Sequence, residues 1–158
     1  MIKIFTQYGL EKQASDLYST GELTISKMVI GDGNGEMYEP SVTQTSLVNQ
    51  RAELDIIDIN ADGNIYQFFA KIPSDSESYT IREVGLIDDE NNLIWISQCE
   101  MDSVLNIEDA VMENIIGVQI EVAQGTTIIT KEGSVQLASK EWTTNNFQVL
   151  AEKGIASG

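Results

Sequence analysis

The sequence predicts a mainly β protein of the α+β class, built as a β-sandwich or as a twisted mixed sheet, with one short helix near the N-terminus. Short runs that alternate apolar and polar side chains recur along the chain, and glycine, asparagine or aspartate residues separate them. The chain has 158 residues, 42% of them hydrophobic, which is enough for one domain with a real core. We therefore expect about six to eight short strands around that core.

The N-terminal segment is expected to be helical. Leu10, Ala14 and Leu17 fall on one face of a 3.6-residue period, which predicts a helix over residues 7–18. The glycine at position 21 then ends the helix. The expected organisation is an N-terminal helical segment at residues 1–22, a β domain at residues 23–138 and a C-terminal tail at residues 139–158 that packs on a partner.

Alternating apolar side chains predict the strands that flank the middle of the chain. Residues 106–114 predict either a short loop or a helical turn, and the type of residues 142–150 stays open. The strands expected from alternation are residues 23–30, 51–59, 65–72 and 114–124.

A hairpin over residues 80–96 is the centre of the predicted fold. Two apolar runs flank a polar turn, and neither alternates cleanly, which indicates strands inside the sheet that are covered on both faces. Arg82 and Glu83 lie side by side in the first run and point to opposite faces, so we expect them to lock the hairpin to other parts of the domain. If Arg82 has a buried charged partner, Arg82→Ala is expected to cost about 2–5 kcal/mol. Gly85 predicts a bulge or a close backbone approach.

The loop at residues 31–35 carries glycine at alternate positions, Gly31, Gly33 and Gly35, with Asp32 between the first two. Glycine permits positive φ, so the pattern predicts a sharp turn after a strand. A phosphate-binding loop requires a following helix and, in the P-loop, a Lys-Ser/Thr pair. The residues after this loop supply neither, so a structural turn is the favoured interpretation.

Residues 58–63 match the first half of a calcium-binding loop. Phe69 stands where the bidentate carboxylate of such a loop belongs, and the match lies between strands instead of helices. Asp62-Gly63 is itself a strong hairpin signal. The sequence therefore predicts a turn there and no metal or cofactor.

Composition excludes several function classes. The net charge is −16, and residues 83–130 contain acidic residues but no lysine or arginine, which disfavours nucleic acid and anionic membranes as partners. The single cysteine, Cys99, and the absence of histidine exclude an internal disulfide, a Cys/His zinc site and a histidine-based catalytic triad. No apolar run approaches the roughly 20 residues of a membrane span, so no membrane insertion is expected. We expect a binding protein and no enzyme.

Five short motifs follow one another along the chain, at residues 29–35, 43–49, 70–73, 81–88 and 92–96. In this order they resemble the N-terminal domain of phage tail-collar fibre proteins. Gln50 and the pair Asn91-Asn92 depart from the residues usual in that family, which are a glutamate and a turn glycine.

The resemblance implies a virion structural protein that links a tail fibre to the baseplate of a contractile tail or of a phage-tail-like bacteriocin. It implies a baseplate wedge protein and a tail-fibre or receptor-binding chain as partners, a homotrimer, and assembly in the bacterial cytoplasm. The alternative hypothesis is a carbohydrate-binding module that recognises a receptor. Trp95, Trp142 and Tyr38 are its candidate stacking platforms.

Overall fold

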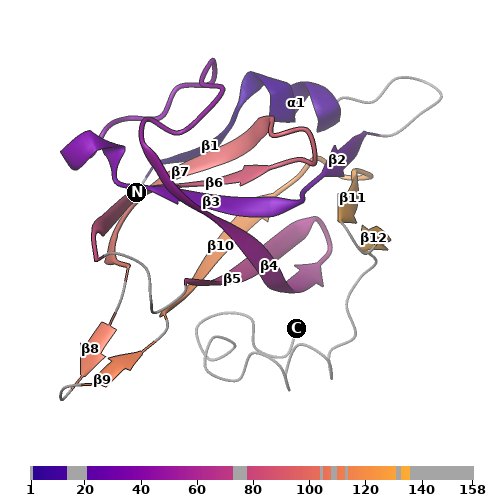
Figure 1. Cartoon of the computed structure of the whole chain (residues 1–158). Coiled ribbons are helices and arrows are strands. Elements are labelled where there is room, and N and C mark those ends of the chain that lie inside the picture. The colour runs from indigo at the N-terminus through magenta and orange to yellow at the C-terminus, as the bar shows by residue number, and fades with distance from the viewer. Residues whose placement is uncertain are drawn as a thin grey trace.

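The computed structural model describes residues 2–13, 21–72, 78–103, 105–107, 110–112, 114–130 and 133–135 (Figure 1). It is mostly β, with 58% of residues in strands and one short α-helix among the described residues. The elements in chain order are β1 (Lys3–Phe5), α1 (Gln7–Gln13), β2 (Glu22–Thr24), β3 (Lys27–Gly31), the 3₁₀ turn η1 (Gly33–Gly35), β4 (Gln50–Asp62), β5 (Ile65–Ile72), β6 (Thr80–Ile87), β7 (Leu93–Asp102), β8 (Leu105–Ile107), β9 (Ala110–Met112), β10 (Asn114–Glu121), β11 (Thr127–Thr130) and β12 (Gly133–Val135).

The main sheet has seven strands in the described part of the chain, in the order β1-β7-β6-β3-β4-β5-β10. Every neighbouring pair in it is antiparallel. Parallel pairing occurs between β11 and β2, which form a small sheet with β12. The prediction of a mainly β fold with a short helix is confirmed. The structure shows a curled antiparallel sheet and does not confirm a sandwich.

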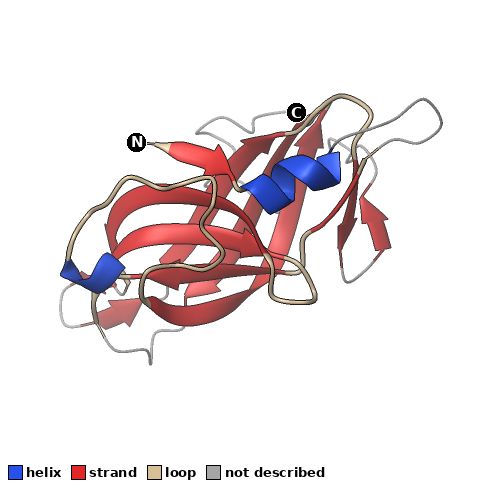
Figure 2. Ribbon diagram, turned by 90° about the horizontal axis from the view of Figure 1, so that it is seen from above, coloured by secondary structure: helices blue, strands red, loops and turns tan. Residues whose placement is uncertain are grey.

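The sheet curls at β4, which is long enough to change partners along its length (Figure 1). Residues 50–55 of β4 pair with β3, and residues 56–62 pair with β5. The register shifts between Ile56 and Asp58, so Ile57 is an extra residue in the strand. A bulge of this kind bends a strand and increases its twist. The two parts of the sheet therefore wrap around a shared interior (Figure 2).

The interior is apolar and draws on both parts of the sheet. Phe68 on β5 and Ile81 on β6 are fully buried, and Trp95 on β7 is 3% exposed. Leu23 and Ile25, at and just after β2, are also fully buried in the same cluster. On β10, Ile116, Val118 and Ile120 face inward and alternate with exposed residues, as the sequence predicted.

The helix α1 packs against β7 through a face that the sequence analysis did not predict. Leu10 is 51% exposed, whereas Gly9 and Gln13 are the buried residues of α1. A Cβ at Gly9 would lie 2.3 Å from the Ile94 carbonyl oxygen, so only glycine permits this contact. The predicted apolar face is therefore wrong at Leu10, and Ala14 and Leu17 lie outside the described residues.

Two further predictions need correction. The strand expected over residues 23–30 is interrupted after Thr24, so that β2 and β3 join different sheets. Residues 106–114 were expected to form a loop or helical turn, but β8 and β9 pair there as an antiparallel hairpin. Short strands of this kind lack the length needed to show a period. The predicted C-terminal tail at residues 139–158 lies outside the described part of the chain.

The remaining strand predictions are confirmed. The hairpin over residues 80–96 is formed by β6 and β7, and both strands lie inside the sheet. The β4–β5 hairpin turns at Gly63 and Asn64, where Gly63 has φ 65°. Within the described residues, no helix is long and apolar enough to cross a membrane.

Candidate functional site

Glu83 on β6 holds a distant loop in place. Its side chain is 1% exposed, yet among the described residues no basic group forms an ion pair with it. Oε1 accepts hydrogen bonds from Val48 N at 2.7 Å and from the Tyr38 hydroxyl. Oε2 accepts from Gly33 N at 3.0 Å and from Asn49 N at 2.8 Å. These donors satisfy the buried carboxylate and tie the loop of residues 33–49 to the sheet.

The glycine loop has the shape that this contact requires. Gly31 is the β3 partner of Glu83, and a Cβ there would lie 2.3 Å from Asn49 O and 2.5 Å from Glu83 Oε2. Gly33 and Gly35 have φ of 63° and 87°, in the left-handed region that glycine favours. Gly31 thus permits close approach, whereas Gly33 and Gly35 permit the turn.

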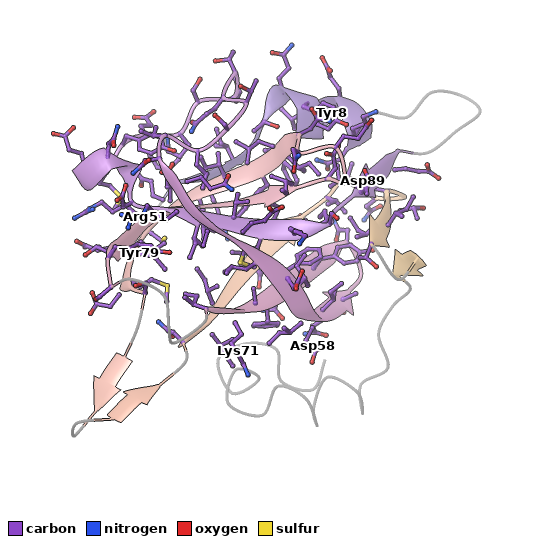
Figure 3. All side chains as sticks on the ribbon, in the orientation of Figure 1. Tyr8, Arg51, Asp58, Lys71, Tyr79 and Asp89 are labelled. Atoms are coloured by element: carbon purple, nitrogen blue, oxygen red, sulfur yellow. The ribbon has the colours of Figure 1, made fainter. Side chains whose placement is uncertain are left out.

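Asp32 also stabilises the glycine loop, through hydrogen bonds that do not involve Glu83. It accepts hydrogen bonds from Asn34 N at 2.9 Å, from Asn49 Nδ2 at 2.7 Å and from Arg51 Nη1 at 2.7 Å. The hydrogen bond from Asn49 is the largest cause that holds the pKa of Asp32 below its ordinary value. Arg51 also lies over the Tyr79 ring, with Cζ 4.4 Å from the ring centroid (Figure 3).

Arg82 is half-buried and reaches the glycine loop without a charged partner. Its Nη1 donates a hydrogen bond of 3.1 Å to the Asp32 carbonyl oxygen. Neither of the ion pairs Lys27–Asp55 and Arg51–Asp32 involves Arg82, and no charged partner of Arg82 is seen among the described residues. Arg82 and Glu83 therefore both contact the loop, but only Glu83 is buried.

Gly85, two residues after Glu83, is a point of close packing. A Cβ there would lie 2.7 Å from Leu93 Cδ1 and 3.1 Å from Trp95 O. The strands β3 and β7 flank it on either side, at Val29 and Ile96. A side chain at this position would push the neighbouring strands apart.

Asp88, at the turn between β6 and β7, is a second buried carboxylate that the sequence analysis did not single out. Its oxygens accept from Glu90 N at 2.9 Å, Asn92 N at 2.8 Å, Asn92 Nδ2 at 3.1 Å and the Tyr8 hydroxyl at 2.7 Å. Asn91 has φ 65°, which asparagine tolerates better than most residues. An aspartate at the start of a polar turn was the available signal, because its side chain accepts from the turn's own amides.

The two tyrosines that donate to these carboxylates stay protonated at neutral pH. Burial is the main cause that raises the pKa of Tyr38, and its hydrogen bond to Glu83 adds to the effect. The hydrogen bond to Asp88 raises the pKa of Tyr8 to about 12. Burial alone would raise the pKa of Asp88, but hydrogen bonds from Tyr8 and Asn92 outweigh it and lower that pKa.

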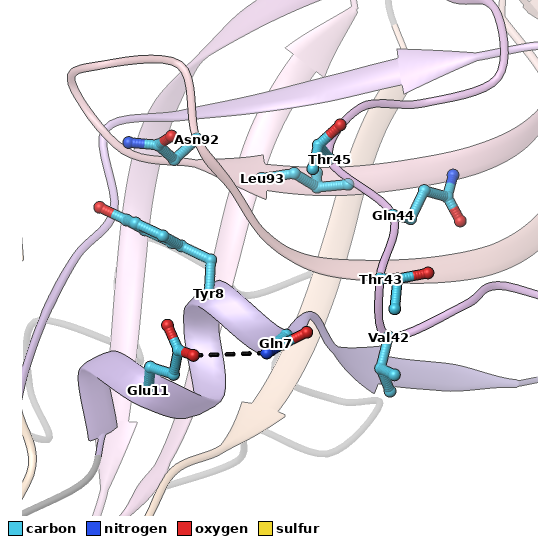
Figure 4. Close-up of a pocket in the computed structure, with 9 residues that line it drawn as sticks. All are labelled: Gln7, Tyr8, Glu11, Val42, Thr43, Gln44, Thr45, Asn92 and Leu93. Atoms are coloured by element: carbon cyan, nitrogen blue, oxygen red, sulfur yellow. Dashed lines mark hydrogen bonds between the residues drawn. The ribbon is translucent and has the colours of Figure 1, made fainter.

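A pocket of about 260 Å³ lies between α1, residues 42–45 of the loop before β4, and the start of β7 (Figure 4). Its polar groups are amides, hydroxyls and the Glu11 carboxylate, which is 3.5 Å from Gln7 Nε2. Such a lining can donate and accept hydrogen bonds, but it offers no nucleophile with an adjacent base. The pocket is lined by Gln7, Tyr8, Glu11, Val42, Thr43, Gln44, Thr45, Asn92 and Leu93.

The other sites considered from sequence have structural explanations. Asp58 lies within β4, where burial raises its pKa to about 7, and Asp62 ends the same strand, so residues 58–63 form no calcium loop. Cys99 is half-buried, and burial raises the pKa of its thiol to about 11. Trp95 is buried, which removes it as a sugar-stacking platform. Tyr38 is half-buried, packs against an apolar cluster and donates its hydroxyl to Glu83, which gives it a structural role. Trp142 lies outside the described residues.

A comparison with protein families finds one relationship that covers nearly the whole chain. The family model described as phage tail-collar fibre protein, N-terminal, matches residues 1–153. No curated protein and no solved structure matches the chain.

Proposed function

The chain belongs to the phage tail-collar fibre family and is a structural protein of a phage tail, and on this premise we propose that it attaches a tail fibre to the baseplate of a contractile tail or of a phage-tail-like bacteriocin. The family match over residues 1–153 is the observation that carries the proposal. The attachment is non-catalytic, and the partners are a baseplate wedge protein and the chain that continues the fibre. Assembly takes place in the bacterial cytoplasm.

The loop of residues 36–49 is the proposed contact with the tail. It exposes three apolar side chains, Met37 at 41%, Val42 at 46% and Val48 at 49%. Its inner side is fixed by the Glu83 hydrogen bonds and by Leu47, which is 6% exposed. A rigid loop loses little conformational freedom on binding, and this favours a permanent attachment site.

The test is incorporation of variants into purified tail particles. We expect Val42→Ser combined with Val48→Ser to lower the amount of the chain in the particles, because the contact loses apolar area. Ile57→Ser is the matched control, because Ile57 is also 49% exposed but lies on β4. Equal incorporation of the loop variant and the wild type would contradict the loop contact, and absence of the wild-type chain from tails would contradict attachment itself.

A homotrimer is part of the proposal, because the resemblance to tail-collar fibre proteins implies it. Sedimentation equilibrium of the purified chain should give three times the monomer mass of 17.4 kDa. A chain that stays monomeric both in solution and within the tail would contradict this part.

A further inference from the structure

The strand β10 is the last strand of the main sheet in the described part of the chain. It pairs with β5 over its whole length, from Asn114 opposite Ile72 to Glu121 opposite Ile65. Within the part of the chain that the structure describes, no strand pairs with its other side. An edge of this kind presents a row of backbone N–H and C=O groups that can bind a further strand.

The edge lacks the features that usually protect such strands. Natural edge strands are short, bulged, or carry lysine or proline, and these features prevent pairing with another chain. β10 has eight residues, contains no lysine or proline, and keeps one register without a bulge. At the opposite end of the sheet, β1 has only three residues and begins with Lys3.

The outer face of β10 is regular and exposed. Ile115 is 42% exposed, and Gln119 and Glu121 are exposed on the same face. Gly117 would interrupt this face, but the Phe69 ring lies over it, since a Cβ at Gly117 would be 2.6 Å from Phe69 Cε1. An aromatic ring over a glycine restores the packing that the glycine lacks.

The net charge of the chain indicates the partner, because the edge itself is not strongly charged: Glu121 on β10 is exposed, and the exposed Lys71 lies opposite Ile115 on β5. Residues 83–130, which include β10, contain ten acidic residues and no lysine or arginine, and the whole chain carries a net charge of −16. A second copy would bring the same excess of negative charge to the contact, whereas a basic segment would be attracted.

We propose that β10 binds an extended, basic segment of a partner protein by adding it to the sheet as a further strand. Backbone hydrogen bonds hold the segment, Ile115 supplies an apolar contact, and the net negative charge of the chain attracts lysine or arginine side chains of the segment. This deepens the proposed function, because it rests on attachment to another tail protein and assigns that protein a basic strand.

The first test uses the full chain and synthetic peptides. A peptide of alternating valine and lysine should bind and should slow amide hydrogen exchange in residues 114–121, measured by mass spectrometry. A peptide of alternating proline and lysine has the same charge but cannot form a strand. We therefore expect it to bind at least about tenfold more weakly than the valine–lysine peptide. A peptide of alternating valine and glutamate should not bind.

Matched variants locate the binding site. Gln119→Lys adds a positive charge at the edge and should weaken the valine–lysine peptide about fivefold. Gln50→Lys makes the same substitution at an exposed position inside the sheet, on β4, and should change affinity by less than about twofold. Ile115→Lys is a second edge variant, and thermal melting confirms that each variant is folded.

Three results would overturn the proposal. Equal binding of the valine–lysine and proline–lysine peptides would show attraction by charge alone. Protection, in the free chain, of the β10 amides that do not bond to β5 would show that the chain itself covers the edge, and protection of those amides that grows with chain concentration would show that a second copy does. If tails incorporate the Gln119→Lys variant to the same extent as the wild-type chain, β10 is excluded as the attachment edge, but attachment itself stands. If tails lack the wild-type chain, attachment is overturned, but the peptide result stands.

Discussion

The two buried carboxylates of the central hairpin are alike in their hydrogen bonding and different in what they connect. Glu83 and Asp88 each accept four hydrogen bonds from described residues, one of them from a tyrosine. The donors to Glu83 all come from the distant loop of residues 33–49, whereas three of the donors to Asp88 belong to its own turn. Glu83 therefore stabilises tertiary structure, and Asp88 stabilises a local turn with one link to α1.

This difference predicts that Glu83→Gln is the most damaging conservative change in the hairpin. The amide NH₂ group cannot accept the hydrogen bonds that one carboxylate oxygen accepts now, so buried donors lose their partners. We expect a loss of about 3–5 kcal/mol in the free energy of unfolding, measured by urea denaturation. Glu53→Gln, at an exposed position of β4, should change it by less than about 0.5 kcal/mol. Similar losses in both variants would contradict the role given to Glu83.

Gly31→Ala tests whether the loop contact with Glu83 depends on close approach. The new methyl group would collide with Asn49 O and Glu83 Oε2, so we expect a loss of about 2–3 kcal/mol in the same measurement. Gly35→Asn is the control, because nothing lies within 4 Å of its Cβ position and asparagine tolerates positive φ. The control should lose less than about 1 kcal/mol. A tolerated alanine at position 31 would show that the loop can move away from β6.

Asp88→Asn should have a smaller, pH-dependent effect of about 1–2 kcal/mol at pH 7. The folded state lowers the pKa of Asp88, so its contribution is complete above the unfolded pKa of about 3.9 and is lost as pH falls through the folded value. The difference in unfolding free energy between wild type and variant should therefore shrink below about pH 4. A difference that stays constant with pH would contradict this assignment.

Arg82→Ala should have the smallest effect, about 1 kcal/mol, because Arg82 is half-buried and donates to a carbonyl oxygen. This is less than the 2–5 kcal/mol expected for an arginine with a buried charged partner. A thermal melt that places the Arg82→Ala loss above that of Glu83→Gln would reverse the comparison.

The hairpins were predictable from sequence because their periods and turn residues are local signals. The β5 strand and the β6–β7 pair follow apolar patterns that need no knowledge of distant residues. The partners of Glu83 were not predictable, because three of its donors are backbone N–H groups and nearly every residue carries one. The buried face of α1 was missed for a related reason, since Gly9 contacts β7 through the absence of a side chain.

The shared strand β4 makes the two parts of the sheet depend on each other. Because residues 50–55 pair with β3 and residues 56–62 pair with β5, neither part can lose its middle strand without exposing the interior of the other. Partial unfolding of either side is therefore penalised, and the domain should melt in a single cooperative transition. For a structural protein of a phage tail, such cooperativity means that the domain either keeps its whole shape or loses all of it at once.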